Sequence, residues 1–93
     1  MIDSATVRRI QAKRADELHR HLCAKIEQAI IDAAMNSRTE LLVQLPNAIQ
    51  HAHPSSIRLE TYAYDIKRLQ FVLKNDGYEV DTTADKNSFI IKW

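Results

Sequence analysis

The sequence predicts an α+β fold in which residues 1–93 form one domain, with two helices packed on a three-stranded sheet. Its first third contains no Pro and no Gly and is rich in residues that favour helix. Two later stretches, TELLVQL and SFIIKW, have the apolar character and the β-branched residues of strands. The only glycine, Gly77, separates a second helical stretch from an alternating run. These observations predict a two-layer α-β-α-β-β arrangement.

The first helix is predicted over residues 4–36, with Asp3 or Ser4 as its N-cap. Asn36 is expected to end it in a left-handed conformation. At 100° per residue, one face collects the apolar side chains that would meet the core. These are Ala15, Leu18, Leu22, Ile26, Ala29, Ile30 and Ala33.

This helix is too long for a compact domain. Its length would be roughly 50 Å at 1.5 Å per residue. A compact domain of this size has a radius of gyration of about 12 Å. We therefore expect the helix to break near Ala15 and Asp16, or residues 1–21 to project.

A strand is predicted next, over residues 39–45, where Pro46 stops it. Leu41 and Val43 would share one face with Leu45, while Leu42 points to the other. The segment NAIQHAHPSS then reads as a loop.

A second helix is predicted over residues 57–75, with Ser55 or Ser56 as its cap. Gly77 can take the positive φ that a helix end requires. The stretches YEVDT and SFIIKW then form two strands joined by the turn TADKN. The core-facing residues of the second helix would be Leu59, Tyr62, Ile66, Leu69 and Leu73.

Some apolar residues lie away from these core stripes. Tyr64 and Phe71 lie nearly opposite the core face of the predicted second helix, and Ile57 extends their line. Val7 and Ile10 are likewise offset from the core stripe of the first helix. The first helix would cover the second apolar face, or another chain would. We favour an interface, homo-oligomeric or with another protein, that uses Val7, Ile10, Ile57, Tyr64 and Phe71, joined by Ile31 and Met35.

Composition excludes several classes of protein. A net charge of +1 gives no overall reason to expect nucleic acid or a membrane surface as partner. The single Cys23 excludes an internal disulfide framework and suits a reducing compartment. No apolar run approaches the roughly 20 residues of a membrane helix. The N-terminal stretch lacks the apolar core of a signal peptide. The prediction is a protein that is neither secreted nor in a membrane.

The sequence contains no strong pattern for a catalytic site or a metal site. One glycine leaves no room for a glycine-rich phosphate loop, and Cys23 lies mid-helix beside the core stripe. His19 and Cys23 have the i,i+4 spacing that can hold one edge of a zinc site. A site of His19, Cys23, His51 and His53 is therefore conceivable, whereas His19 and His21 diverge on a helix. Surface histidines and a structural thiol are the expectation, with no cofactor and no enzymatic activity.

Nucleic-acid binding by the first helix is the alternative function. A basic helix can bind along the phosphates of a nucleic acid. The cationic side chains of this helix are Arg8, Arg9, Lys13 and Arg14. Acidic residues in the same stretch leave residues 1–20 at about +2. No known motif for reading DNA or RNA is present.

The stretches LKNDGYEV and SFIIKW resemble a C-terminal pattern found in small proteins of tailed bacteriophages. In that pattern Leu-x-x-x-Gly-Tyr-x-Val is followed by a short hairpin that ends on Ile-x-Trp. The resemblance covers about residues 22–93, and this chain has NSR where a glycine turn is common. It implies a phage accessory or virion-associated protein of unassigned function, in the host cytoplasm or the virion, that binds a host or phage protein. The matching positions are Leu73, Gly77, Tyr78, Val80, Ile91 and Trp93.

Overall fold

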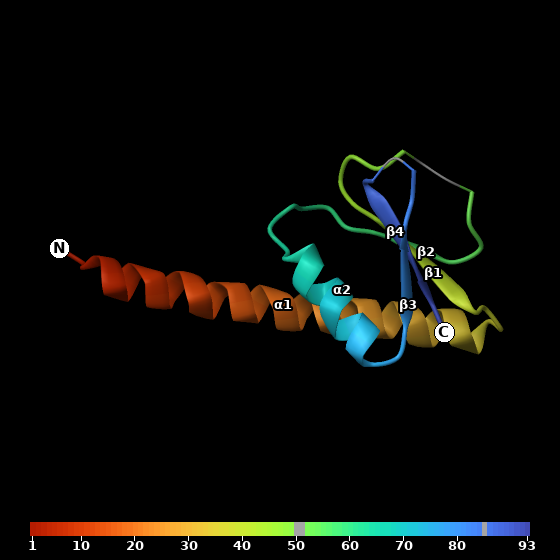
Figure 1. The fold of residues 1–93 in the computed structure, drawn as a ribbon, viewed down its shortest axis with the longest axis horizontal. Coiled ribbons are helices and arrows are strands. Elements are labelled where there is room, and N and C mark those ends of the chain that lie inside the picture. Colours follow the sequence, from red (N-terminus) through yellow and green to blue (C-terminus); the bar gives the residue numbers. More distant parts are fainter. Residues whose placement is uncertain (50–51, 85) are drawn as a thin grey trace.

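The structure is a computed structural model that describes residues 1–49, 52–84 and 86–93. A long helix runs past a small sheet, and a short second helix lies beside it (Figure 1). The elements in chain order are α1 (Ser4–Met35), β1 (Glu40–Gln44), β2 (Ser56–Arg58), α2 (Ile66–Asn75), β3 (Glu79–Thr82) and β4 (Ser88–Lys92).

The sheet confirms the α+β class but has four strands, in the order β2-β1-β4-β3. The prediction of three strands is wrong because residues 56–58, assigned to the second helix and its cap, form β2. This strand runs parallel to β1 and places Ile57 opposite Val43. The Leu42 amide donates to the Ser55 carbonyl at 2.9 Å, and the Leu59 amide donates to that of Gln44 at 2.8 Å. The β3–β4 pair is antiparallel, as the hairpin prediction requires, and the β1–β4 pair is antiparallel as well.

Helix α2 is therefore shorter than predicted. It begins at Ile66, and the Asp65 side chain accepts the Arg68 amide at 3.1 Å as its N-cap. Neither Ser55 nor Ser56 caps a helix. Tyr62, predicted to be buried on this helix, lies before it and is 61% exposed.

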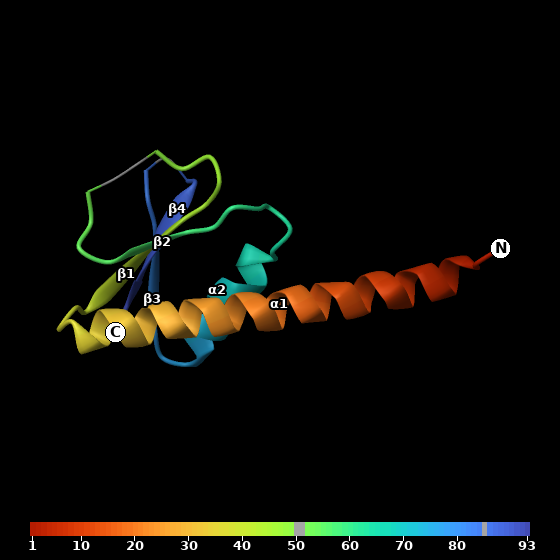
Figure 2. The same cartoon turned by 180° about the vertical axis from the view of Figure 1, so that it is seen from behind.

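Helix α1 runs without a break from Ser4 to Met35. The Asp3 side chain caps it by accepting the Thr6 amide at 2.7 Å. Its first half extends beyond the body of the protein, and residues 1–17 are all exposed (Figures 1 and 2). Of the two predicted solutions to its length, projection is the one observed. The molecule measures 53 × 26 × 18 Å, with a radius of gyration of 15.1 Å.

Both helices pack on the same face of the sheet, which gives the predicted two layers. That face carries Leu41 and Val43 from β1 with Phe89 and Ile91 from β4. Leu42 points to the opposite face, beside Ile90, and is also buried. The helices contribute Leu22, Ile26, Ile30, Leu69 and Leu73, and Leu59 joins them from the segment after β2.

Each helix is followed by one residue of positive φ. Gly77 has φ +94°, as predicted for the end of the second helix. After α1 this role falls to Ser37, with φ 60°, whereas Asn36 has φ −95°. The expectation of a left-handed Asn36 is therefore wrong by one position.

Candidate functional site

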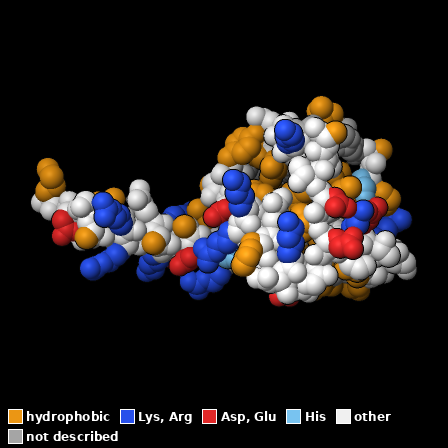
Figure 3. Space-filling model, viewed as in Figure 1, with side chains coloured by type: hydrophobic (Ala, Val, Ile, Leu, Met, Phe, Trp, Pro, Cys, Tyr) orange, Lys and Arg blue, Asp and Glu red, His pale blue; other side chains and the backbone are white. Residues whose placement is uncertain are grey.

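Val7 and Ile10 lie on the projecting half of α1. Their side chains are 41% and 56% exposed. Ile31 and Met35, which the sequence placed in the same contact, are 44% and 79% exposed near the other end of the helix. Figure 3 shows apolar and basic side chains interspersed along the projecting half. The helix thus presents apolar groups to solvent at both of its ends.

Ile57, Tyr64 and Phe71 do not form the second apolar face that the sequence predicted. Ile57 belongs to β2, Tyr64 precedes α2, and both are half-buried against the core cluster. Phe71, on α2, is 65% exposed. The predicted face assumed one helix over residues 57–75, and β2 removes that assumption. Phe71 alone of the three has the exposure expected of an interface residue.

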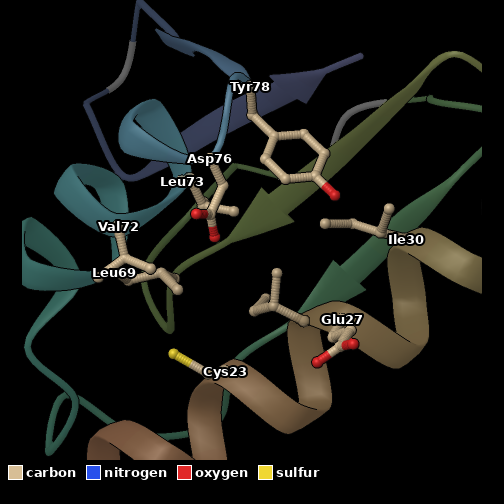
Figure 4. A pocket seen from close by; sticks show the side chains of 9 residues that line it. Cys23, Glu27, Ile30, Leu69, Val72, Leu73, Asp76 and Tyr78 are labelled. Carbon is tan, nitrogen blue, oxygen red and sulfur yellow. The ribbon is translucent and has the colours of Figure 1, made fainter.

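A groove of about 260 Å³ lies between α1 and α2 (Figure 4). Cys23 lies at one end and Tyr78 at the other, with Leu69 and Leu73 along one wall. Burial raises the pKa of the Cys23 thiol; the positive charge of Arg68 opposes this, and the carboxylates of Glu27 and Asp76 add to it. A thiol with a raised pKa is a poor nucleophile at neutral pH. Cys23 is therefore not an activated nucleophile in this groove.

An ion pair fixes the projecting half to the body at its base. Arg68 Nη1 on α2 donates to Asp16 Oδ1 on α1 at 2.8 Å. This hydrogen bond and the positive charge of Arg68 lower the pKa of Asp16. The pair lies where the exposed first half of α1 gives way to the packed second half.

A wider groove of about 600 Å³ separates the middle of α1 from residues 61–64. Leu18 and Tyr64 are among its lining residues, and both are half-buried. Arg14, Glu17 and His21 lie along its helical wall, with Arg14 Nη1 at 3.6 Å from Glu17 Oε2. Sequence reasoning missed this groove because it placed residues 61–64 inside a helix.

Among the residues that the structure describes, the histidines do not converge on a metal site. His19 Nε2 lies 3.5 Å from Cys23 Sγ, as the i,i+4 spacing requires. His53 Nδ1 instead lies 2.6 Å from the Ser55 carbonyl, and its buried Nε2 is 3.4 Å from Glu40 Oε1, without a well-aligned hydrogen bond. His51 lies outside the described residues. Among the described residues, no group of three or more His, Cys, Asp or Glu side chains is placed to hold a metal ion.

The four cationic residues proposed for nucleic acid all lie on the projecting half of α1 and are exposed. At 100° per residue, Arg9 and Lys13 share a face, whereas Arg8 and Arg14 point away in different directions. The cations therefore surround the helix instead of forming a single basic stripe.

Comparison with known proteins finds no matching protein-family model, curated protein or solved structure. Within the described part of the chain, no helix is long and apolar enough to cross a membrane.

Proposed function

We propose that the protein is a non-enzymatic interaction module that self-associates and binds a protein partner through the exposed face of α1. The observation that carries this proposal is the projecting first half of α1 with exposed Val7 and Ile10. The resemblance to small phage proteins adds the proposed setting, a phage accessory protein that binds a host or phage protein.

Helix energetics support a partner for this segment. Isolated helices shorter than about 12–15 residues are marginal in water, and most helices are stabilised by packing of an apolar face. The segment before Asp16 has that length and carries two exposed branched apolar side chains. A partner that covers Val7 and Ile10 would stabilise it as a helix.

Photo-crosslinking tests the proposal. A benzophenone amino acid would replace Val7 or Ile10 in the protein expressed in the cells that normally make it. We expect covalent adducts with protein, whether another copy or a different chain. The matched control places the same group at Ala12, which is also exposed but lies on another face of α1. Adducts no more frequent at positions 7 and 10 than at position 12 would reject the interaction surface.

Nucleic-acid binding is the second candidate, and the exposure of Arg8, Arg9, Lys13 and Arg14 on the projecting segment favours it. It predicts an affinity for duplex or single strands that falls steeply between 50 and 200 mM salt. Substitution of the four residues by Ser should abolish that binding. Fluorescence anisotropy with labelled oligonucleotides measures both, and absent or salt-insensitive binding would remove this candidate.

A further inference from the structure

Helix α1 carries a second stripe of residues spaced alternately three and four apart along its whole length. We call it the outer stripe, and all its members are exposed. This is the heptad spacing with which helices pair. At 100° per residue its centre lies about 130° around the helix from the centre of the core stripe. The outer stripe comprises Val7, Ile10, Arg14, Glu17, His21, Ala24, Gln28, Ile31 and Met35.

The outer stripe is apolar at both ends and polar in the middle. In a parallel pair each position would face its own copy, so that Arg14 meets Arg14 and Glu17 meets Glu17. In an antiparallel pair centred near residue 19, Val7 faces Ile31 of the second copy. Glu17 then faces His21 of the second copy, and Arg14 faces Ala24. The antiparallel arrangement pairs Val7 with Ile31 and separates the like charges of Arg14 and of Glu17, whereas Ile10 then faces Gln28 of the second copy.

We propose that α1 pairs with α1 of a second copy of this chain, antiparallel along the outer stripe, so that Val7 of each copy packs against Ile31 of the other. This inference rests on the proposed function and names its partner. The paired segment, residues 7–31, is about 37 Å long at 1.5 Å per residue.

The charge along α1 supports this orientation. Residues 1–14 hold four cationic side chains and one carboxylate, whereas residues 16–36 hold two cationic side chains and four carboxylates. Antiparallel pairing places the basic half of each helix beside the acidic half of the other. Lys13, next to the outer stripe, comes beside Glu27 of the second copy. A shorter overlap of the projecting halves alone would set Arg8 against Arg9.

The shape of the molecule permits the same arrangement. The body packs on the core stripe of α1, on a different side of the helix from the exposed Ile31 and Met35. The projecting half of a second copy can therefore lie along this end of α1. The two bodies then sit at opposite ends of the pair. The wide groove, in which residues 61–64 lie across from Arg14, Glu17 and His21 of the outer stripe, comes close to the two-fold axis, so the second helix must pass along this groove.

Disulfide trapping in the full chain tests the orientation, in a Cys23→Ala background. Mild oxidation of a mixture of Val7→Cys and Ile31→Cys chains should yield a covalent heterodimer. Each chain alone should yield little dimer, because residues 7 and 7 lie far apart in an antiparallel pair. Ala12→Cys mixed with Ile31→Cys is the matched control and should yield none. A dimer from Val7→Cys alone, or equal yields from all mixtures, would overturn the proposal.

Light scattering separates this inference from the proposed function. The untagged protein should have twice the mass of one chain, at low and at high salt. Val7→Ser with Ile10→Ser should raise the dimer dissociation constant at least about 100-fold, because four apolar side chains leave the interface. Near-ultraviolet circular dichroism should show the body still folded. A monomer at all concentrations would overturn the pairing of two copies. If benzophenone adducts with a different protein then formed, the proposed function as a protein-binding module would still hold.

Discussion

At the scale of single residues, both helices end in the same hydrogen-bonded turn. After α1, the Arg38 amide donates to Ala33 and the Ser37 amide to Ala34. After α2, the Tyr78 amide donates to Leu73 and the Gly77 amide to Lys74. These are Schellman motifs, which place one residue in the left-handed region. Gly77 was predictable because glycine adopts positive φ freely. Ser37 was not, because its neighbour Asn36 is the residue type that favours this conformation.

Exchanging residue types at these two positions should shift stability in opposite directions. Ser37→Gly relieves a left-handed serine, so we expect the free energy of unfolding to rise by about 0.5–1 kcal/mol. Gly77→Ser should lower it by a similar amount, although a Cβ at Gly77 would meet nothing within 4 Å. Urea denaturation measures both. Changes of the same sign in the two variants would contradict the conformational explanation.

The ion pair between Asp16 and Arg68 predicts a response to acid. Its hydrogen bond lowers the pKa of Asp16 in the folded state. A carboxyl group with a lowered folded pKa stabilises the fold above its unfolded pKa, and this contribution is lost as pH falls through the folded pKa. We therefore expect Asp16→Asn to flatten the loss of stability below about pH 4. Arg68→Gln should do the same, and an unchanged acid slope in urea titrations of either variant would contradict this role.

At the scale of elements, β2 is where sequence reasoning failed. Leu59, Leu69 and Leu73 have spacing that fits one helical face, and all three are buried. Leu59 lies directly after β2 and the other two lie on α2, so their burial does not come from one helix. The signal for β2 itself was weak, because a three-residue strand is too short to show an alternating pattern. A useful signal was present in Asp65, which is a preferred N-cap residue directly before Ile66. The helix was instead predicted to begin at residue 57, because the helical spacing of the apolar residues extends back to Leu59.

Leu59 and Tyr62 provide the clearest mutational contrast between the predicted helix and the observed structure of residues 59–65, which lie between β2 and α2. The helix would bury both, whereas Leu59 is 0% and Tyr62 61% exposed. We expect Leu59→Ala to cost about 2–5 kcal/mol of unfolding free energy. Tyr62→Ala should change it by less than about 0.5 kcal/mol. Thermal or urea unfolding compares them, and a large cost for Tyr62→Ala would place that side chain in a core.

At the scale of the whole molecule, the sequence already contained the conflict that defines its shape. An unbroken helix of this length could not fit inside a compact domain, and the structure resolves this by projection. The exposure of Val7 and Ile10 followed from their offset from the core stripe. The outer stripe was harder to recognise, because polar residues such as Arg14 and Glu17 interrupt its apolar pattern. Which side chains of α1 stay exposed depends on where the rest of the protein packs against the helix. This could be known only from the structure.

If the projecting helices pair, the stability of the fold must depend on protein concentration, because dissociation accompanies unfolding. An enthalpy of about 0.7 kcal/mol per residue predicts a melting temperature that rises by about 4 °C for each tenfold increase in concentration. Val7→Ser with Ile10→Ser should melt at a temperature independent of concentration. Differential scanning calorimetry over a hundredfold range measures this. Concentration-independent melting of the unaltered protein would mean that the body unfolds without a partner, and that the exposed helix contributes nothing to its stability.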